Sequence, residues 1–117
     1  YLTQKLDIAV VGIGYPNEKS AIMATGYFKE NEIESLIDRK VAGELCMQFY
    51  DIYGDTAPYK DDNNVIGMDI SMLRSVPRSI GIAGGVEKLR AVRGAINGHY
   101  INTLITDIEC AEALISE

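Results

Sequence analysis

Apolar positions change their spacing along the chain, and each spacing predicts a different element. Residues 6 to 13 are apolar on both faces and rich in β-branched side chains, which is typical of a parallel strand covered on both sides. Residues 30 to 39 carry apolar side chains at every third or fourth position, a helical stripe that Asn31 is placed to cap. The first third therefore predicts a strand followed by a helix.

The middle of the chain is less regular. Residues 41 to 53 are apolar and aromatic and fit a strand, the end of a helix, or both. Residues 55 to 64 are polar and contain Pro58 and several Asp and Asn, which predicts an exposed loop or hairpin. Asp69 is then placed to cap a short helix that ends before Pro77.

The last forty residues have the clearest pattern. They predict a strand at 78 to 83, a tight Gly84-Gly85 turn, and a helix at 86 to 96 that Asn97-Gly98 closes, with Val86, Leu89, Val92 and Ile96 on one face. A second strand at 100 to 105 and a capping box over residues 106 to 109 lead into a terminal helix. This βαβα order predicts an α/β fold with a parallel, Rossmann-like sheet.

Composition narrows the class of protein. A chain of 117 residues with 47% hydrophobic content is sized for one domain, and a net charge of −6 argues against direct nucleic-acid binding. The longest apolar run, residues 8 to 11, is far below the roughly 20 residues of a membrane span. Cys46 and Cys110 lie in apolar stretches, which predicts buried free thiols in a reducing cytoplasm, with a disulfide between them as the alternative.

The strongest local chemistry lies where the strand at 78 to 83 meets the following helix. Gly84 and Gly85 let a ligand approach the backbone, the helix N-terminus offers free N–H groups, and Lys88 adds a positive charge one turn later. Together they predict a cradle for an anion or phosphate. Spacing alone favours the alternative of a plain βα turn with a solvated lysine.

Other candidates are weaker on the residues alone. Gly12 and Gly14 end a strand where ligands collect in open α/β sheets, but Asn17 stands where a dinucleotide fingerprint needs its third glycine. Asp51 lies beside aromatic residues, so its carboxylate is placed either to accept sugar hydroxyls or to form a turn before Gly54. The sequence predicts no metal, no cofactor and no catalytic constellation; Asp107 reads as a helix cap and His99 as a loop residue.

Longer strings of residues resemble the SorC family of sugar-binding bacterial transcriptional regulators. Residues 65 to 88, with their Ala-Gly-Gly-x-x-Lys ending, carry the resemblance, which continues over residues 91–98 and 101–107 and earlier over 7–14 and 41–54. The resemblance implies a fold like that of phosphosugar isomerases and glucosamine-phosphate deaminases. Residues 1–117 would be the C-terminal part of the effector domain, and the helix-turn-helix and the first half of that domain have no counterpart here.

The resemblance also implies roles for individual residues. Lys88 matches the phosphate-contacting lysine, which reverses the preference for a plain turn, and Asp51 matches a sugar-contacting aspartate. Gly12 and Gly14 match the strand-end loop. Glu44 departs from the family pattern, which has Asp after the glycine, and puts contacts near that turn in doubt.

The function that follows is a cytoplasmic effector-binding module that takes up a sugar or sugar phosphate as a homo-oligomer, dimer or tetramer, and acts on DNA through another domain. It has no membrane partner. One alternative is a sugar-phosphate isomerase or deaminase of the same fold, and another is a purely structural oligomerisation piece.

Overall fold

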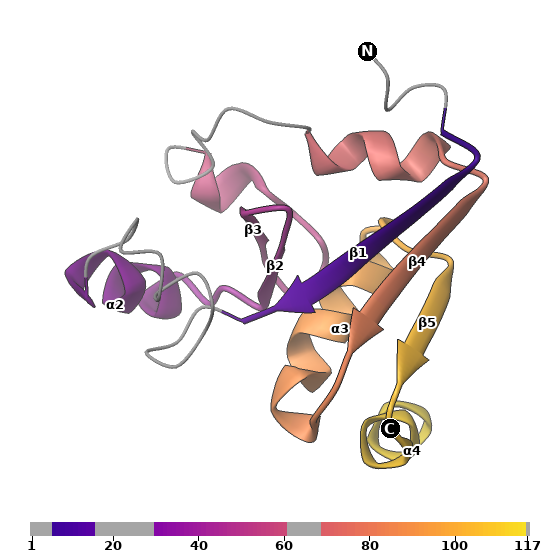
Figure 1. Cartoon of the computed structure of the whole chain (residues 1–117). Coiled ribbons are helices and arrows are strands. Elements are labelled where there is room, and N and C mark those ends of the chain that lie inside the picture. The colour runs from indigo at the N-terminus through magenta and orange to yellow at the C-terminus, as the bar shows by residue number, and fades with distance from the viewer. Residues whose placement is uncertain (1–5, 16–29, 61–68, 117) are drawn as a thin grey trace.

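The computed structural model describes residues 6–15, 30–60 and 69–116, which form an α/β fold on a mixed five-stranded sheet of order β3-β2-β1-β4-β5 (Figure 1). Its parallel part consists of β1 (Ile8–Gly14), β4 (Arg78–Ala83) and β5 (Thr103–Thr106). The predicted parallel strands are confirmed. The last strand begins at Thr103 and not at residue 100.

The ambiguous stretch at residues 41 to 53 forms a hairpin. Strands β2 (Gly43–Leu45) and β3 (Gln48–Tyr50) are antiparallel, and β2 joins the end of β1 in antiparallel register. Cys46 and Met47 make the two-residue turn with φ of 52° and 66°, a backbone geometry that type I′ turns require. The fully parallel sheet expected from the sequence is therefore extended by two antiparallel strands.

The two cysteines differ in their surroundings. Cys110 is fully buried, as predicted, whereas Cys46 is exposed at the hairpin turn, so the prediction of a buried Cys46 was wrong. Both thiols are free, which excludes the alternative of a disulfide between them. The hairpin explains the error, because Cys46 lies at its turn and is exposed, whereas the next turn residue, Met47, packs against the core.

The helices are short and lie on one side of the parallel strands. They are α2 (Glu30–Asp38), α3 (Leu89–Asn97), α4 (Ile108–Ile115) and 3-10 helices at Ala57–Tyr59, Ile70–Ser75 and Val86–Lys88. Asn31 lies inside α2 and is not its cap, whereas Asp69 caps the 3-10 helix at residues 70 to 75 through the Ser71 N–H, as predicted. Within the described residues, no helix is long and apolar enough to cross a membrane.

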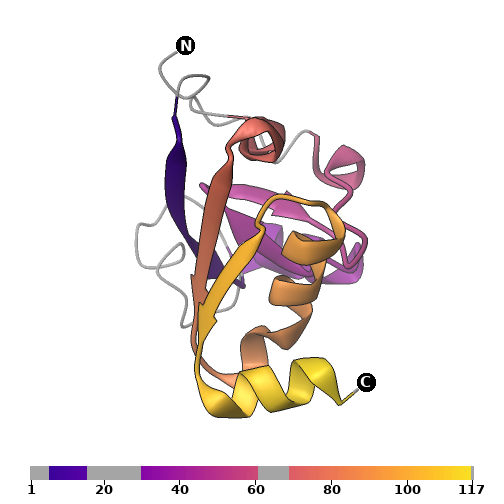
Figure 2. The same ribbon diagram turned by 90° about the vertical axis from the view of Figure 1, so that its right-hand side faces the viewer.

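Among the described residues, only one face of the parallel sheet is covered. Figure 2 shows the strands with α3 and the hairpin all on one side. On the other side Ile8 and Val10 of β1 are 57% and 60% exposed. The prediction that β1 is covered on both faces is therefore wrong for the described part of the chain, and the apolar pattern of β1 has a partner on one side only.

The covered face is packed through small residues. Ala91, Val92 and Ala95 of α3 are fully buried, while Val86 and Ile96 are 47% and 39% exposed. Of the predicted apolar stripe, Val86 and Ile96 are therefore not part of the buried face. A side chain at Gly43 would meet Ala91 and the Tyr50 hydroxyl. The hairpin therefore lies directly on α3, and the Tyr50 hydroxyl donates a 2.7 Å hydrogen bond to the Ala91 carbonyl.

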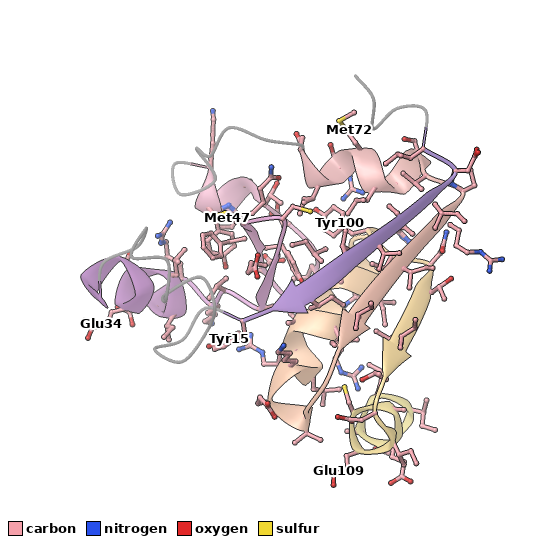
Figure 3. All side chains as sticks on the ribbon, viewed as in Figure 1. Tyr15, Glu34, Met47, Met72, Tyr100 and Glu109 are labelled. Atoms are coloured by element: carbon pink, nitrogen blue, oxygen red, sulfur yellow. The ribbon has the colours of Figure 1, made fainter. Side chains whose placement is uncertain are left out.

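A second tyrosine closes the end of the core beyond α3. Tyr100 lies between the hairpin and the 3-10 helix at residues 70 to 75 (Figure 3), with its ring 5.8 Å from that of Tyr50. Its hydroxyl donates to the Gly54 carbonyl, and the Arg74 guanidinium lies 4.7 Å from the centre of its ring. These contacts fix the turn after β3 against the end of α3.

Candidate functional site

The carboxyl ends of the parallel strands bring four residues into one row. Gly12 pairs with Ile82, and Ile82 with Ile105, so the row two residues further along contains Gly14, Gly84 and Asp107. Gly14 also pairs with Glu44 of β2. Because side chains alternate between faces and paired residues share a face, all four lie on the side opposite α3. We call Gly14, Glu44, Gly84, Gly85, Lys88 and Asp107 the strand-end site.

The floor of this site has no side chains. At Gly14 a Cβ atom would meet the Glu44 carboxylate, so a side chain there would require Glu44 to shift. Gly85 has φ of 94° and ψ of 139°, a conformation that only glycine adopts without strain. Gly84 is less restricted, since a Cβ would lie 3.7 Å from the Asp107 carboxylate, an ordinary contact. The backbone is therefore open to a ligand at Gly84, whereas the carboxylates of Glu44 and Glu87 lie over Gly14 and Gly85.

Asp107 holds two elements in place with its two oxygens. Oδ1 accepts a 2.8 Å hydrogen bond from the Cys110 N–H and so caps α4, as predicted. Oδ2 accepts a 2.7 Å bond from the Gly85 N–H, and the two donors hold the pKa of Asp107 below its usual value. The cap of α4 is therefore Asp107. The predicted capping box began one residue earlier, at Thr106.

Lys88 stands at the entry to α3. The helix starts as the 3-10 turn Val86–Lys88, in which the Lys88 N–H donates to the Gly85 carbonyl. The Lys88 side chain is half-buried, and it is near enough to Glu44 for its charge to act on that carboxylate. The geometry therefore brings together Lys88, Gly84, Gly85 and Gly14, four of the six residues that the sequence singled out.

Glu44 and Asp107 are the two members of the site that the sequence did not propose as ligand-binding residues. The Oε2 atom of Glu44 accepts a 3.0 Å hydrogen bond from the Met47 N–H across the hairpin turn, and its Oε1 lies over Gly14. Burial raises the pKa of Glu44 above its usual value, while the Met47 N–H and the Lys88 charge lower it in part. Its only sequence signal was the departure from the family's Asp at this position. The result is a partly buried carboxylate beside the lysine.

Asp51 lies elsewhere. Its Oδ1 accepts bonds of 2.9 and 3.0 Å from the N–H groups of Tyr53 and Asp55, so the carboxylate forms the turn before Gly54, one of the two roles left open. Its backbone carbonyl lies against Gly94, six residues beyond Lys88 and roughly 9 Å further along the helix. A contact between Asp51 and a ligand stays a prediction.

Gly12 and His99 lie outside the strand-end site. Gly12 is on the uncovered face of β1, where a Cβ atom would have no neighbouring atom within 4 Å. His99 is an exposed turn residue with φ of 60°, as expected of a loop residue. Among the described residues, no three His, Cys, Asp or Glu side chains form a group able to hold a metal ion. The described chemistry of the site is thus one lysine, the carboxylates of Glu44 and Asp107 with that of Glu87 over Gly85, and glycine backbone that is exposed at Gly84.

Comparison with known proteins shows the family to which the chain belongs. The model of the Sugar-bind family, described as "Putative sugar-binding domain", matches residues 1–116. The chain is 38% identical over 110 residues to the sorbitol operon regulator of Klebsiella pneumoniae. The matched residues make up 94% of this chain and 35% of that protein. The crystal structure of full-length SorC from the same organism matches with a TM-score of 0.83 at 35% identity, covering 97% of this chain and 37% of that one.

A further solved structure agrees with these matches. A DeoR family transcriptional regulator from Listeria monocytogenes matches with a TM-score of 0.86 at 27% identity, over 95% of this chain and 45% of that one. The chain thus spans about a third to a half of the proteins that it matches. The resemblance to SorC-type regulators inferred from the motifs is confirmed, and the chain belongs to the Sugar-bind family.

Proposed function

We propose that residues 1–117 are the C-terminal part of the effector domain of a bacterial transcriptional regulator and bind a sugar or sugar phosphate at the strand-end site. The observation that carries this proposal is the half-buried Lys88 beside a floor of glycine backbone at the carboxyl ends of β1 and β4. Ligands of open α/β sheets bind at this edge. DNA binding belongs to a helix-turn-helix domain outside these residues.

The side chains of the site suit a polyhydroxylated ligand. Lys88 donates to phosphate or hydroxyl oxygens, and Glu44 accepts from hydroxyl groups. Gly84 leaves room for a ligand against the backbone, because a Cβ atom there would have only the Asp107 carboxylate within 4 Å. Asp51 stays in the proposal as a sugar-contacting residue, as the family resemblance implies, and Gly12 and Gly85 as backbone contacts.

The regulatory part of the proposal is a linkage between two binding events. The Klebsiella and Listeria relatives are transcriptional regulators, and a ligand shifts operator binding only if its affinity differs between two states of the protein. We place the regulator in the cytoplasm as a dimer or tetramer. The finer fold assignment, to the phosphosugar isomerase and glucosamine-phosphate deaminase type, belongs to the same proposal.

The enzyme alternative has less support. Both oxygens of Asp107 accept backbone N–H bonds, so this carboxylate is occupied and its pKa is low for a general base at neutral pH. The named relatives are regulators and not isomerases or deaminases. A turnover assay with sugar phosphates separates the two, because product formed at ordinary enzyme rates would contradict the regulator assignment.

Thermal shift of the full-length protein tests the proposed function. A bound ligand raises the free energy of unfolding by mass action, by about 2.7 kcal/mol at 100 times its Kd, and so raises the melting temperature. We expect phosphorylated sugars to raise the melting temperature of the wild type and to lose this effect in Lys88→Ala. Lys60→Ala, which removes the same charge from an exposed residue at the far side of the hairpin, is the matched control. An unchanged shift in Lys88→Ala would contradict the phosphate assignment.

A further inference from the structure

We propose that Glu44 selects the charge of the ligand, so that the strand-end site accepts a sugar with at most one phosphoryl group and discriminates against sugar bisphosphates. The inference rests on the proposed function, because it takes the strand-end site as the sugar site. It deepens that function by narrowing the class of sugar and by naming the residue that sets the limit.

The glycine floor of the site carries more negative than positive charge. A carboxylate lies beside each of its glycines: Cβ atoms on Gly14, Gly84 and Gly85 would meet the carboxylates of Glu44, Asp107 and Glu87 respectively. Lys88 is the only cation among the described residues that define the site. Three negative charges therefore lie beside a single positive charge, which limits the negative charge that a ligand can bring.

Glu44 differs from the other two carboxylates in how it is held. Glu87 is exposed, and both oxygens of Asp107 accept backbone N–H bonds. Glu44 is partly buried, and the 3.0 Å bond from the Met47 N–H to its Oε2 keeps its Oε1 over Gly14. Solvent screens a partly buried charge much less than an exposed one. Of the three, Glu44 should therefore act most strongly on the charge of a ligand.

The surroundings of Glu44 favour its ionised form. Burial raises the pKa of Glu44, whereas the Met47 N–H and the Lys88 charge lower it. Both of the lowering groups act by stabilising the carboxylate. The positive charge of Lys88 is thus already shared with a carboxylate of the protein before a ligand binds.

A hydroxyl group and a phosphoryl group meet Glu44 differently. A carboxylate only accepts hydrogen bonds, and a sugar hydroxyl can donate one to it. A phosphoryl group carries up to two negative charges at pH 7 and offers acceptor oxygens, so a carboxylate repels it. One phosphoryl group can be balanced by Lys88, whereas a second one at the Gly14 end of the floor would face Glu44.

Calorimetric titration of the full-length regulator with matched ligands tests the inference. The probes are fructose, glucose and ribose, each as the free sugar, a monophosphate and a bisphosphate. In the wild type we expect the bisphosphate to bind at least about 10-fold more weakly than the better of the other two forms, because like charges placed together are strongly unfavourable. Equal or tighter binding of a bisphosphate would overturn the proposal.

Glu44→Gln assigns the discrimination to the charge of one residue. Glutamine keeps the length of the side chain and an oxygen that can accept from the Met47 N–H. We expect the ratio between the bisphosphate Kd and the Kd of the better form to fall below about 3-fold. If Glu44 only holds Lys88 in place, this variant weakens all forms alike and leaves the ratio unchanged, which would contradict the proposal.

Two further variants serve as controls for Glu44→Gln. Asp7→Asn removes the same charge at an exposed residue before β1, seven residues and roughly 23 Å from Gly14 along the strand, so the Kd ratio should not change. Glu87→Gln removes the exposed carboxylate at Gly85, and we expect a smaller effect than that of Glu44→Gln because solvent screens it. An effect of either control as large as that of Glu44→Gln would show that Glu44 is not the determinant.

The same titrations separate this inference from the proposed function. If monophosphates and bisphosphates bind the wild type equally well, the charge limit is wrong and the sugar site stands. If no probe binds the wild type, the proposed function fails for these sugars and the charge limit falls with it.

Discussion

Gly85 carries the backbone geometry on which the strand-end site depends, and the neighbouring Gly84 provides an internal comparison. Gly85 has φ of 94°, whereas a methyl group on Gly84 would make only an ordinary contact. We expect Gly85→Ala to lower the free energy of unfolding by about 1 to 3 kcal/mol and Gly84→Ala to change it by less than about 1 kcal/mol. Urea unfolding measures both. Similar values for the two variants would show that the loop is not strained at Gly85.

At the same scale, the sequence identified some residues of the strand-end site and missed others for physical reasons. Glycines after a strand and a lysine one turn later are local signals, so Gly84, Gly85 and Lys88 could be found. Glu44 joins them only because β2 pairs with the end of β1, a contact between distant segments that no spacing encodes. The sequence left two roles open for Asp51, contact with sugar hydroxyls or a turn before Gly54. The hydrogen bonds from the N–H groups of Tyr53 and Asp55 show the turn role.

Among the elements, the βαβα unit was predictable and the hairpin was not. Strand β4, helix α3, strand β5 and helix α4 follow one another with short turns, and periodicity separates them. The hairpin turn consists of Cys46 and Met47 in the left-handed region, without the Asn-Gly or Asp-Gly pair that signals such turns. Its register is fixed by packing on Ala91 of α3 and by the Glu44 bond to the turn, both of which are tertiary contacts.

The connection between the glycine loop and α4 should depend on pH through Asp107. Its folded pKa lies below the usual value of 3.8, so the ionised carboxylate contributes stability that is complete well above pH 4 and is lost as pH falls through the folded pKa. Asparagine still caps a helix but carries no charge. We expect Asp107→Asn to be less stable than wild type at pH 7, and the difference to shrink between pH 4 and pH 2 in urea unfolding. A difference independent of pH would contradict the charge-assisted role of Asp107.

For the whole molecule, the alternation of apolar residues predicted more burial than the described chain provides. The β1 sequence is apolar on both faces, yet Ile8 and Val10 are more than half exposed. A pattern records the environment in which a sequence evolved, and that environment includes any polypeptide that packs against it. The exposure of Ile8 and Val10 therefore differs from the burial that the apolar pattern of β1 predicted.

Effector and operator binding must be coupled if this molecule is part of a regulator, and the coupling is reciprocal. We expect a sugar that stabilises the full-length protein to change its operator Kd by about 5-fold or more, at fixed salt because phosphate contacts are salt-dependent. Operator Kd without sugar should be unaltered in Lys88→Ala, since the net charge of this chain is already −6 and Lys88 lies at the proposed sugar site, at the end of the Val86–Lys88 turn. Fluorescence anisotropy with labelled operator measures these constants. A sugar that raises the melting temperature and leaves operator Kd unchanged would be a ligand without an effector role, and the regulator assignment would then fail even though the binding site stands.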